Sequence, residues 1–327
     1  MRILCLHARR CLYSSMDQIK TVSPRHYFIS REKRAGLKYL LLSLPFLVFV
    51  FAFSYVPLYS WIYSFFHYQI GHTLSDMTFV GFDNFAKLLN QSDKFLRVMR
   101  NTLVMSLLNV VCTPLPVIFA IMLNSIRNSK FKRFVQTATT LPNFISWIIV
   151  FGIATLIFSS GGLVSTVQDK FNIRPSEINI LGNVNAVWLF QLALGIWKSL
   201  GWSAIIYIAA IAGIDEEQYD AVKVDGANKL QTIFHVTIPG LIPTFLVLLL
   251  LNISNLLNNG LEQYFVFWNP LVSDRIEVLD FYVYQVGILA QDYSFSVVLG
   301  MFKTLISIIL LFTCNGISKK LRGNSLV

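Results

Sequence analysis

The chain has 327 residues, of which 55% are hydrophobic and only 13% are charged. Soluble globular domains carry about a quarter charged residues, so this composition, with a mean hydropathy of +0.59, excludes an ordinary soluble domain. The formal net charge of +10 does not indicate a nucleic-acid partner, because the Lys and Arg residues gather in tails and connectors and form no continuous basic face. The four cysteines lack CxxC spacing, which predicts neither a disulfide framework nor a metal site.

The N-terminal segment is basic, and the first apolar run follows it directly. Nine Lys or Arg residues lie among the first 38 positions, so we expect residues 1–36 to form a cytoplasmic tail. Residues 37–66 are predicted to be the first membrane span. No charge separates Lys38 from His67, and about 20 apolar residues suffice to cross the hydrocarbon core.

Five further apolar runs predict five further spans. They cover residues 101–123, 134–160, 186–212, 240–257 and 294–318. Pro114 and Pro116 mark a break in the second span. The connector after that span is strongly basic, which places it and the N-terminal tail on the cytoplasmic side; its cations are Arg127, Lys130, Lys132 and Arg133.

This pattern predicts an all-α integral membrane protein with six transmembrane helices in residues 37–318 and both termini in the cytoplasm. Residues 67–95, 161–185 and 258–293 are expected to be external, and the basic tail 319–327 to be internal. The last external segment carries five acids against one base, Arg275; the acids are Glu262, Asp274, Glu277, Asp280 and Asp292.

Residues 214–239 form a polar stretch between two apolar runs, and span parity places them in the cytoplasm. Asp215 is a good N-cap, and Gln218 completes a capping-box pattern. The Asp225-Gly226 dipeptide predicts a turn. A second helix, about residues 227–235, is expected to end before Pro239. These features indicate two short helices that present a surface to a soluble partner.

The same stretch resembles the EAA loop of binding-protein-dependent ABC importer permeases. That pattern is Glu-Ala-Ala, three residues, Gly, nine residues, Ile, any residue, then Leu-Pro. The chain has Asp220-Ala221-Val222, Gly226 and Val236-x-Ile238-Pro239 at the same spacing, with conservative departures. Further segments are similar to carbohydrate-uptake permeases, and most to the LplB-like group for oligosaccharides or polysaccharide fragments: FVGFDNF at 79–85, Asn101-Thr102-Leu103, WKSLGW at 197–202, GLEQYFV from Gly260 and VLDFYVYQVG from Val278.

The resemblance implies the MetI-like fold of a type I ABC importer in a bacterial cell membrane. It implies as partners two ATP-binding subunits, a second and different permease subunit, an extracytoplasmic solute-binding protein, lipid and an oligosaccharide. ATP and Mg²⁺ would be used by the ATPase subunit, with no cofactor on this chain. The residues that would couple it to the ATPase are Glu217, Tyr219, Asp220, Ala221, Val222, Asp225, Gly226, Ala227, Phe234 and Pro239.

Polar and aromatic residues inside the spans are candidates for a substrate pathway. Asn252, Asn255 and Asn259 follow a helical spacing, and their amides suit sugar hydroxyls; helix–helix hydrogen bonding is the alternative. Lys198 and Lys303 could attract an acidic sugar or reach toward the membrane surface. Trp197, Trp202, Tyr264 and Trp268 could stack on sugar rings or form an interfacial aromatic belt.

Other functions have less support in the sequence. It contains no GxxxxGK[ST], HExxH or GxSxG motif, so we expect no catalytic residue in this chain. An ion-coupled secondary transporter would show ionisable relays and internal repeats, and neither is clear. An ABC permease for another solute stays open.

Overall fold

The computed structural model describes residues 25–90, 92–171 and 180–322. Residues 1–24, 172–179 and 323–327, which include most of the predicted N-terminal tail, lie outside the described part. The described residues are helical, with one isolated β-bridge between Phe66 and Phe79. The chain divides into two compact units, Met1–Ser60 and Trp61–Val327, which are described separately.

The first unit holds most of the first predicted span. Helix α2 (Arg25–Val50) continues into the π-helical turn η1 (Phe51–Tyr55) and the 3₁₀ helix η2 (Val56–Phe65), whose end belongs to the second unit. The wide turn η1 directly precedes Pro57, a residue that has no N–H to donate to the preceding turn. A π-helical turn at this point lets the helix continue past the proline.

Within the described residues, six helical stretches are long and apolar enough to cross a membrane. They are Lys38–Phe65, Asp93–Asn124, Trp147–Lys170, Val187–Ala212, Lys229–Ser254 and Tyr293–Gly316. The prediction of an all-α protein with six spans is therefore confirmed. The predicted boundaries need correction at the third and fifth spans.

The second span and the region predicted as the third span are both broken. Helix α4 (Ser92–Val111) is followed by α5 (Pro114–Asn124), so the break lies where the prolines predicted it. The prediction of one continuous span over 134–160 is wrong. That region contains the end of α6 (Ser129–Thr140), the 3₁₀ turn η4 (Leu141–Phe144) and α7 (Trp147–Phe158). The helical run ends at Ile145 and Ser146, whose backbone is extended, and the Ser146 side chain caps the new helix.

The fifth span begins earlier than predicted, because Pro239 does not end the preceding helix. Helix α11 (Lys229–Thr232) passes through the π-helical turn η6 (Ile233–Thr237) into α12 (Ile238–Ser254). Pro239 lies in the first turn of α12, where a missing N–H is tolerated. The wide turn before it gives the ring space. A proline is therefore a poor marker of a helix end here.

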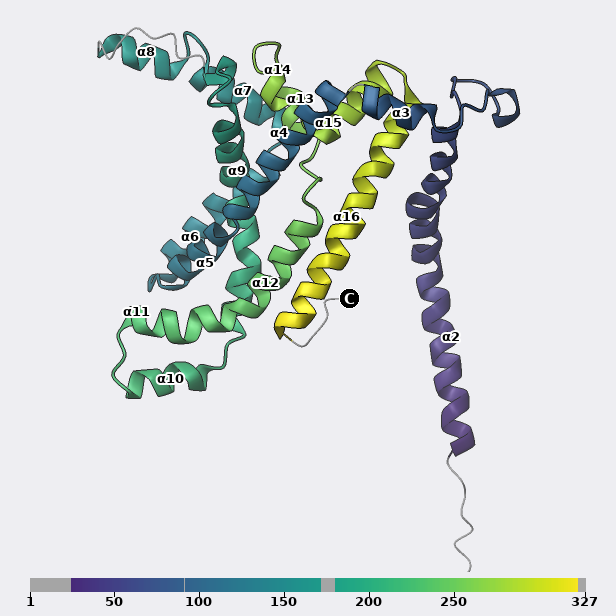
Figure 1. The fold of residues 1–327 in the computed structure, drawn as a ribbon. Coiled ribbons are helices and arrows are strands. Elements are labelled where there is room, and N and C mark those ends of the chain that lie inside the picture. Colours follow the sequence, from purple (N-terminus) through teal and green to yellow (C-terminus); the bar gives the residue numbers. More distant parts are fainter. Residues whose placement is uncertain (1–24, 91, 172–179, 323–327) are drawn as a thin grey trace, which may run out of the picture. The chain divides into compact units, whose positions relative to one another are not determined.

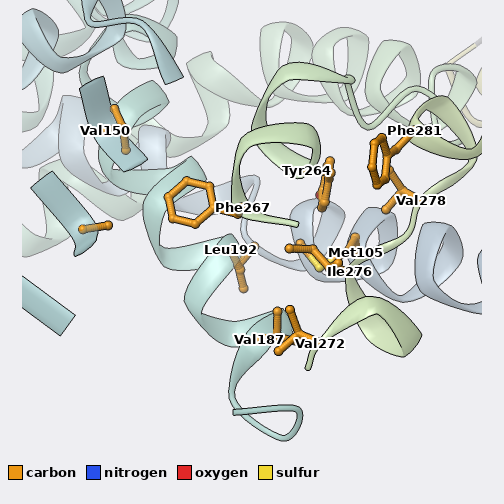
Figure 2. Packing of buried hydrophobic residues seen from close by; sticks show 11 residues of the cluster. Met105, Val150, Val187, Leu192, Tyr264, Phe267, Val272, Ile276, Val278 and Phe281 are labelled. Atoms are coloured by element: carbon orange, nitrogen blue, oxygen red, sulfur yellow. The ribbon is translucent and has the colours of Figure 1, made fainter. Parts of the chain in front are cut away.

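The segment 258–293, predicted as an external loop, is mostly helical and packs into the core of the second unit. It forms α13 (Glu262–Phe267), α14 (Ser273–Ile276), α15 (Leu279–Tyr284) and the π-helical turn η7 (Gln285–Leu289), and then α16 (Tyr293–Arg322) begins. Val272, Val278 and Leu279 are 0% exposed. Figure 2 shows Phe267 and Phe281 of this segment among side chains of α4, α7 and α9 (Val187–Ala212). The acidic residues of this segment lower its mean hydropathy, so its buried apolar residues were not predicted from the sequence.

Two buried polar residues of α4 fix this segment. The Asn101 Nδ2 donates to the carbonyl oxygens of Asp274 and Glu277, each at 3.0 Å. The Thr102 Oγ1 accepts a hydrogen bond of 2.8 Å from the Leu279 backbone N–H. Buried backbone groups need such partners, so the Asn-Thr pair serves as an anchor for α14 and α15.

We predict that Asn101→Ala destabilises the protein by about 1–3 kcal/mol, because the Glu277 carbonyl loses its side-chain donor and the Asp274 carbonyl keeps only Arg100. The unfolding temperature of the purified protein in detergent measures this change. Asn124→Ala is the control, since the Asn124 side chain is exposed and accepts only from Lys132. Equal unfolding temperatures for the two variants would contradict an anchoring role.

Candidate functional site

The polar stretch between α9 and α12 forms a helical hairpin at one end of the second unit. Helix α10 (Glu216–Val224) and α11 lie at the end away from α13, α14 and α15 (Figure 1). Asp215 accepts from the Glu217 N–H at 3.1 Å, and Gly226 has φ +74°, a conformation that glycine adopts without strain. The first predicted helix and the turn are confirmed, whereas the second helix continues into α12 past its predicted end. The reciprocal capping box, however, joins Asn228 and Gln231.

The hairpin is attached to the start of the fifth span by two contacts. The Tyr219 hydroxyl lies 3.2 Å from the Thr237 Oγ1, and Thr237 is buried in η6. A Cβ on Gly240 would overlap the Ile214 side chain, so the residue before α10 packs directly on α12. These two contacts join α10 and the residues before it to the start of the fifth span.

The outer surface of the hairpin carries exposed apolar side chains close to charged ones. The side chain of Phe234 is 64% exposed, and those of Val224 and Leu230 are 87% and 66% exposed. Val224 and Leu230 were not among the predicted coupling residues, although apolar residues in a polar loop indicate such a surface. Asp220 and Lys223 form an exposed ion pair of 2.8 Å, and the hydrogen bond to Asp220 raises the pKa of Lys223.

Most of the predicted coupling residues lie on this exposed surface, and three are partly buried. The exposed ones are Glu217, Asp220, Ala221, Asp225, Gly226, Phe234 and Pro239, and the partly buried ones are Tyr219, Val222 and Ala227. A surface that mixes exposed apolar groups with charges is typical of a protein-binding site.

A cavity with both polar and apolar lining residues lies among α4, α5, α9, α12 and the residues after α12. Its volume is about 590 Å³, and Asn109, Ser199, Trp202 and Ser203 contribute to its lining. All three predicted asparagines, Asn252, Asn255 and Asn259, also line it. The structure thus brings the predicted amides and Trp202 together at one cavity. Trp197 is exposed and lies outside this lining.

The three asparagines differ in how far their amides are already used. Helix α12 ends at Ser254, so the prediction that they share one helical face is wrong for Asn259. The Asn259 Nδ2 donates to the Thr102 carbonyl at 3.0 Å, and its Oδ1 accepts from Ser106 at 2.9 Å. Asn255 donates to the Leu251 carbonyl at 3.0 Å. Asn252 is exposed in the cavity, which makes it the amide best placed for a ligand.

Lys198 lies at the break between α6 and α7. Its Nζ donates to the carbonyl oxygens of Pro142, Asn143 and Ile145, at 3.3, 2.8 and 2.5 Å. The carbonyls at a helix end have no partner within the helix, and hydrocarbon supplies none. Lys198 therefore stabilises the break.

The broken span packs closely against α9 beside the cavity. A Cβ on Gly201 would overlap the Thr139 carbonyl oxygen, so the backbone of α6 touches α9. The rings of Phe144 and Trp202 meet edge to face with centroids 5.7 Å apart. Because Trp202 also lines the cavity, the position of the break sets the shape of one cavity wall.

The remaining candidates have other surroundings. Lys303 forms an ion pair with Asp280. Tyr264 is 2% exposed in the core, so its predicted stacking on a sugar ring is wrong, and burial raises its pKa. The Trp268 Nε1 lies 3.3 Å from the Glu277 carboxylate. Within the described residues, no three His, Cys, Asp or Glu side chains gather as a metal site would require.

Membrane-length helices around a polar cavity, with an exposed helical hairpin at one end, define a polytopic membrane transport subunit. The chain belongs to the binding-protein-dependent transport system inner membrane components, whose family model matches residues 113–323. It is thus a MetI-like permease subunit of an ABC importer. Subunits of this kind are not enzymes, since a separate subunit hydrolyses ATP.

Relatives with known names support this assignment over most of the chain. Protein LplB of Bacillus subtilis (strain 168) is 35% identical over 292 residues, which are 88% of this chain and 90% of LplB. The polygalacturonan/rhamnogalacturonan transport system permease protein YteP of the same organism is 35% identical over 302 residues, 89% of this chain and 92% of YteP. A crystal structure of a bacterial alginate ABC transporter, in complex with an alginate pentasaccharide-bound periplasmic protein, matches with a TM-score of 0.80 and 28% identity, covering 91% of this chain and 99% of its own.

We predict that Lys198→Met lowers the stability by about 1–3 kcal/mol, because three carbonyl groups lose their common donor. Lys198→Arg should recover part of the loss, since a guanidinium supplies several N–H groups. Thermal unfolding in detergent measures both. Lys170→Met is the control, because Lys170 is exposed at the end of α8 (Leu163–Lys170). A loss no larger than the control would show that Lys198 does not hold the break.

Proposed function

We propose that this permease translocates oligosaccharides, including acidic polysaccharide fragments, into the cytoplasm by alternating access. The observation that carries the proposal is the amide-lined cavity of about 590 Å³ among the spans. Amide groups both donate and accept, as sugar hydroxyls require. The names of YteP and of the alginate transporter, both concerned with acidic polysaccharides, support the acidic class.

The hairpin of α10 and α11 is the docking element for an ATP-binding subunit. Its exposed apolar side chains would enter a groove on that subunit, and the Tyr219–Thr237 contact would pass the motion to α12. ATP and Mg²⁺ act on the partner. The basic connector near the hairpin supports a cytoplasmic location for this end and for both termini, in a bacterial cell membrane.

The complete importer contains two ATPase subunits, a second and different permease chain and an extracytoplasmic solute-binding protein. Residues 37–318 act as its transmembrane domain, with 1–36 and 319–327 as tails. Within this domain, Asn252, Asn255 and Trp202 face the substrate. Contacts of Asn259, Trp197, Lys198 and Lys303 with the sugar stay predictions, and Asn259, Lys198 and Lys303 already have protein partners.

Reconstitution of the complex into liposomes tests this function against ion-coupled transport. We expect uptake of an oligosaccharide only when ATP, an ATPase subunit and the binding protein are all present. Uptake driven by an ion gradient without ATP would refute the proposal. ATP-dependent uptake restricted to solutes other than sugars would refute the substrate class alone.

We predict that Asp220→Lys, and separately Gly226→Pro, leaves the protein in the membrane but uncouples it. The first variant reverses a charge on the docking surface, and the second forces a negative φ where the chain has φ +74°. Substrate-stimulated ATP hydrolysis and uptake should both fall at least tenfold, as expected for a loss of about 1.4 kcal/mol in docking.

Gln218→Lys is the matched control for Asp220→Lys, because two residues along α10 turn a side chain about 200° away. Gln218 is exposed, and uptake by this variant should stay within about twofold of the unmodified protein. Normal uptake by both the Asp220 and Gly226 variants would remove the hairpin from the coupling mechanism.

We predict that Asn252→Leu raises the KM of oligosaccharide uptake at least about fivefold, since one good hydrogen bond to the ligand contributes about 1 kcal/mol. The side chain is exposed in the cavity, so the unfolding temperature should not change. A normal KM together with a normal unfolding temperature would exclude Asn252 from the pathway.

A further inference from the structure

A second, smaller cavity lies between α15, α16 and the end of the fifth span. Its volume is about 430 Å³, and its polar lining consists of Asn258, Asp280, Lys303, Thr304 and Ser307. Asn258 also lines the larger cavity. The two cavities are therefore neighbours across one asparagine side chain.

An ion pair occupies one wall of the smaller cavity. The Lys303 Nζ donates to the Asp280 Oδ1, and the two side chains are 20% and 15% exposed. The second oxygen of Asp280 accepts from the Gly260 N–H at 2.9 Å, which keeps the carboxylate in place. Partly buried charges of opposite sign are costly to desolvate, and charges within membrane spans commonly mark a transport pathway.

The same face of α16 carries a hydroxyl group without a partner. The Ser307 Oγ is buried and has no hydrogen-bond partner within the described part of the chain. Buried hydroxyls are almost always satisfied, so this part of the cavity lining is incomplete in the chain alone. Ser307, Lys303 and Gly300 are three and four residues apart on α16 and share one face.

Gly300 keeps the cavity open. A Cβ at this position would meet no atom within 4 Å, so the backbone does not need glycine for steric reasons. A larger side chain would instead extend into free space. The absence of a side chain here thus leaves this volume unfilled by the chain itself.

We propose that the smaller cavity binds one sugar ring that carries a carboxylate. Lys303 binds the carboxylate, and Asp280 accepts hydrogen bonds from ring hydroxyls. Asp280 also opposes the ligand's negative charge, which limits its affinity and permits its release. The inference rests on the proposed oligosaccharide uptake and specifies the acidic sugar unit that it recognises.

The test measures ATP-driven uptake by the full complex in proteoliposomes. The probes are tri-galacturonate and its methyl ester, which has the same length without the charges. Asp280→Asn keeps an acceptor for Gly260 and removes the repulsion, so the KM for tri-galacturonate should fall at least about fivefold. Lys303→Gln should raise it by a similar factor. The interaction between two unit charges at contact distance is strong enough, even in water, to change the KM by about this factor. The methyl ester should change less than about twofold in both variants.

The opposite signs separate recognition from a structural role. If the ion pair only held α15 to α16, both variants would impair uptake of both probes alike, and that result would overturn the inference. The same binding protein serves every variant, so differences between variants belong to the permease. Uptake of the methyl ester alone by the unmodified complex would overturn the inference but not the proposed function. Uptake of neither probe would count against both.

Gly300→Leu tests occupancy of the cavity without altering either charge. It should abolish uptake of both probes and leave the unfolding temperature and the assembly with the ATPase unchanged. Gly316→Leu is the matched control on the same helix, because a Cβ there also meets no atom within 4 Å. Normal uptake of tri-galacturonate by Gly300→Leu would show that no sugar ring enters this cavity.

Discussion

Every break in a membrane helix exposes backbone carbonyls that hydrocarbon cannot satisfy, and this constraint governs the architecture of the second unit. At the break between α6 and α7 the solution is one ammonium group, which Lys198 brings from α9 to three carbonyl oxygens. The break can therefore lie beside the cavity, and its Phe144 ring meets Trp202 at the cavity wall. A polar cavity within the membrane depends on such local pairing.

The sequence predicted what depends on local pattern and failed where distant parts of the chain meet. Hydropathy alone located the six spans, and the Asp215 cap and the Asp225-Gly226 turn located the hairpin. The packed segment 258–293 was missed, because its burial depends on Asn101 and Thr102, over 150 residues away. Lys198 stood out as a charge in an apolar run, but nothing local indicates that Pro142 and its neighbours are its partners.

The sequence predicted which residue types belong to the candidate site, but it did not predict how those residues are arranged. The asparagines do gather at a cavity with Trp202. Asn259, however, is held by α4, because the helix ends at Ser254 and turns it toward Thr102 and Ser106. Lys303 was predicted as a candidate site residue, but its ion-pair partner Asp280 was not, because Asp280 lies in a segment that was predicted to be an external loop. Charge balance inside the membrane thus became visible only with the fold.

The helix from Lys229 to Ser254 is uninterrupted from the hairpin to the cavity. At about 1.5 Å per residue, it spans about 35 Å between Lys229 and Asn252. It therefore links the hairpin mechanically to the amides of the cavity. The wide turn η6, Pro239 and Pro243 lack the regular i to i−4 bonding of the rest of the helix. Resistance to bending is lowest over residues 233–243, so a movement of the hairpin would bend the helix there.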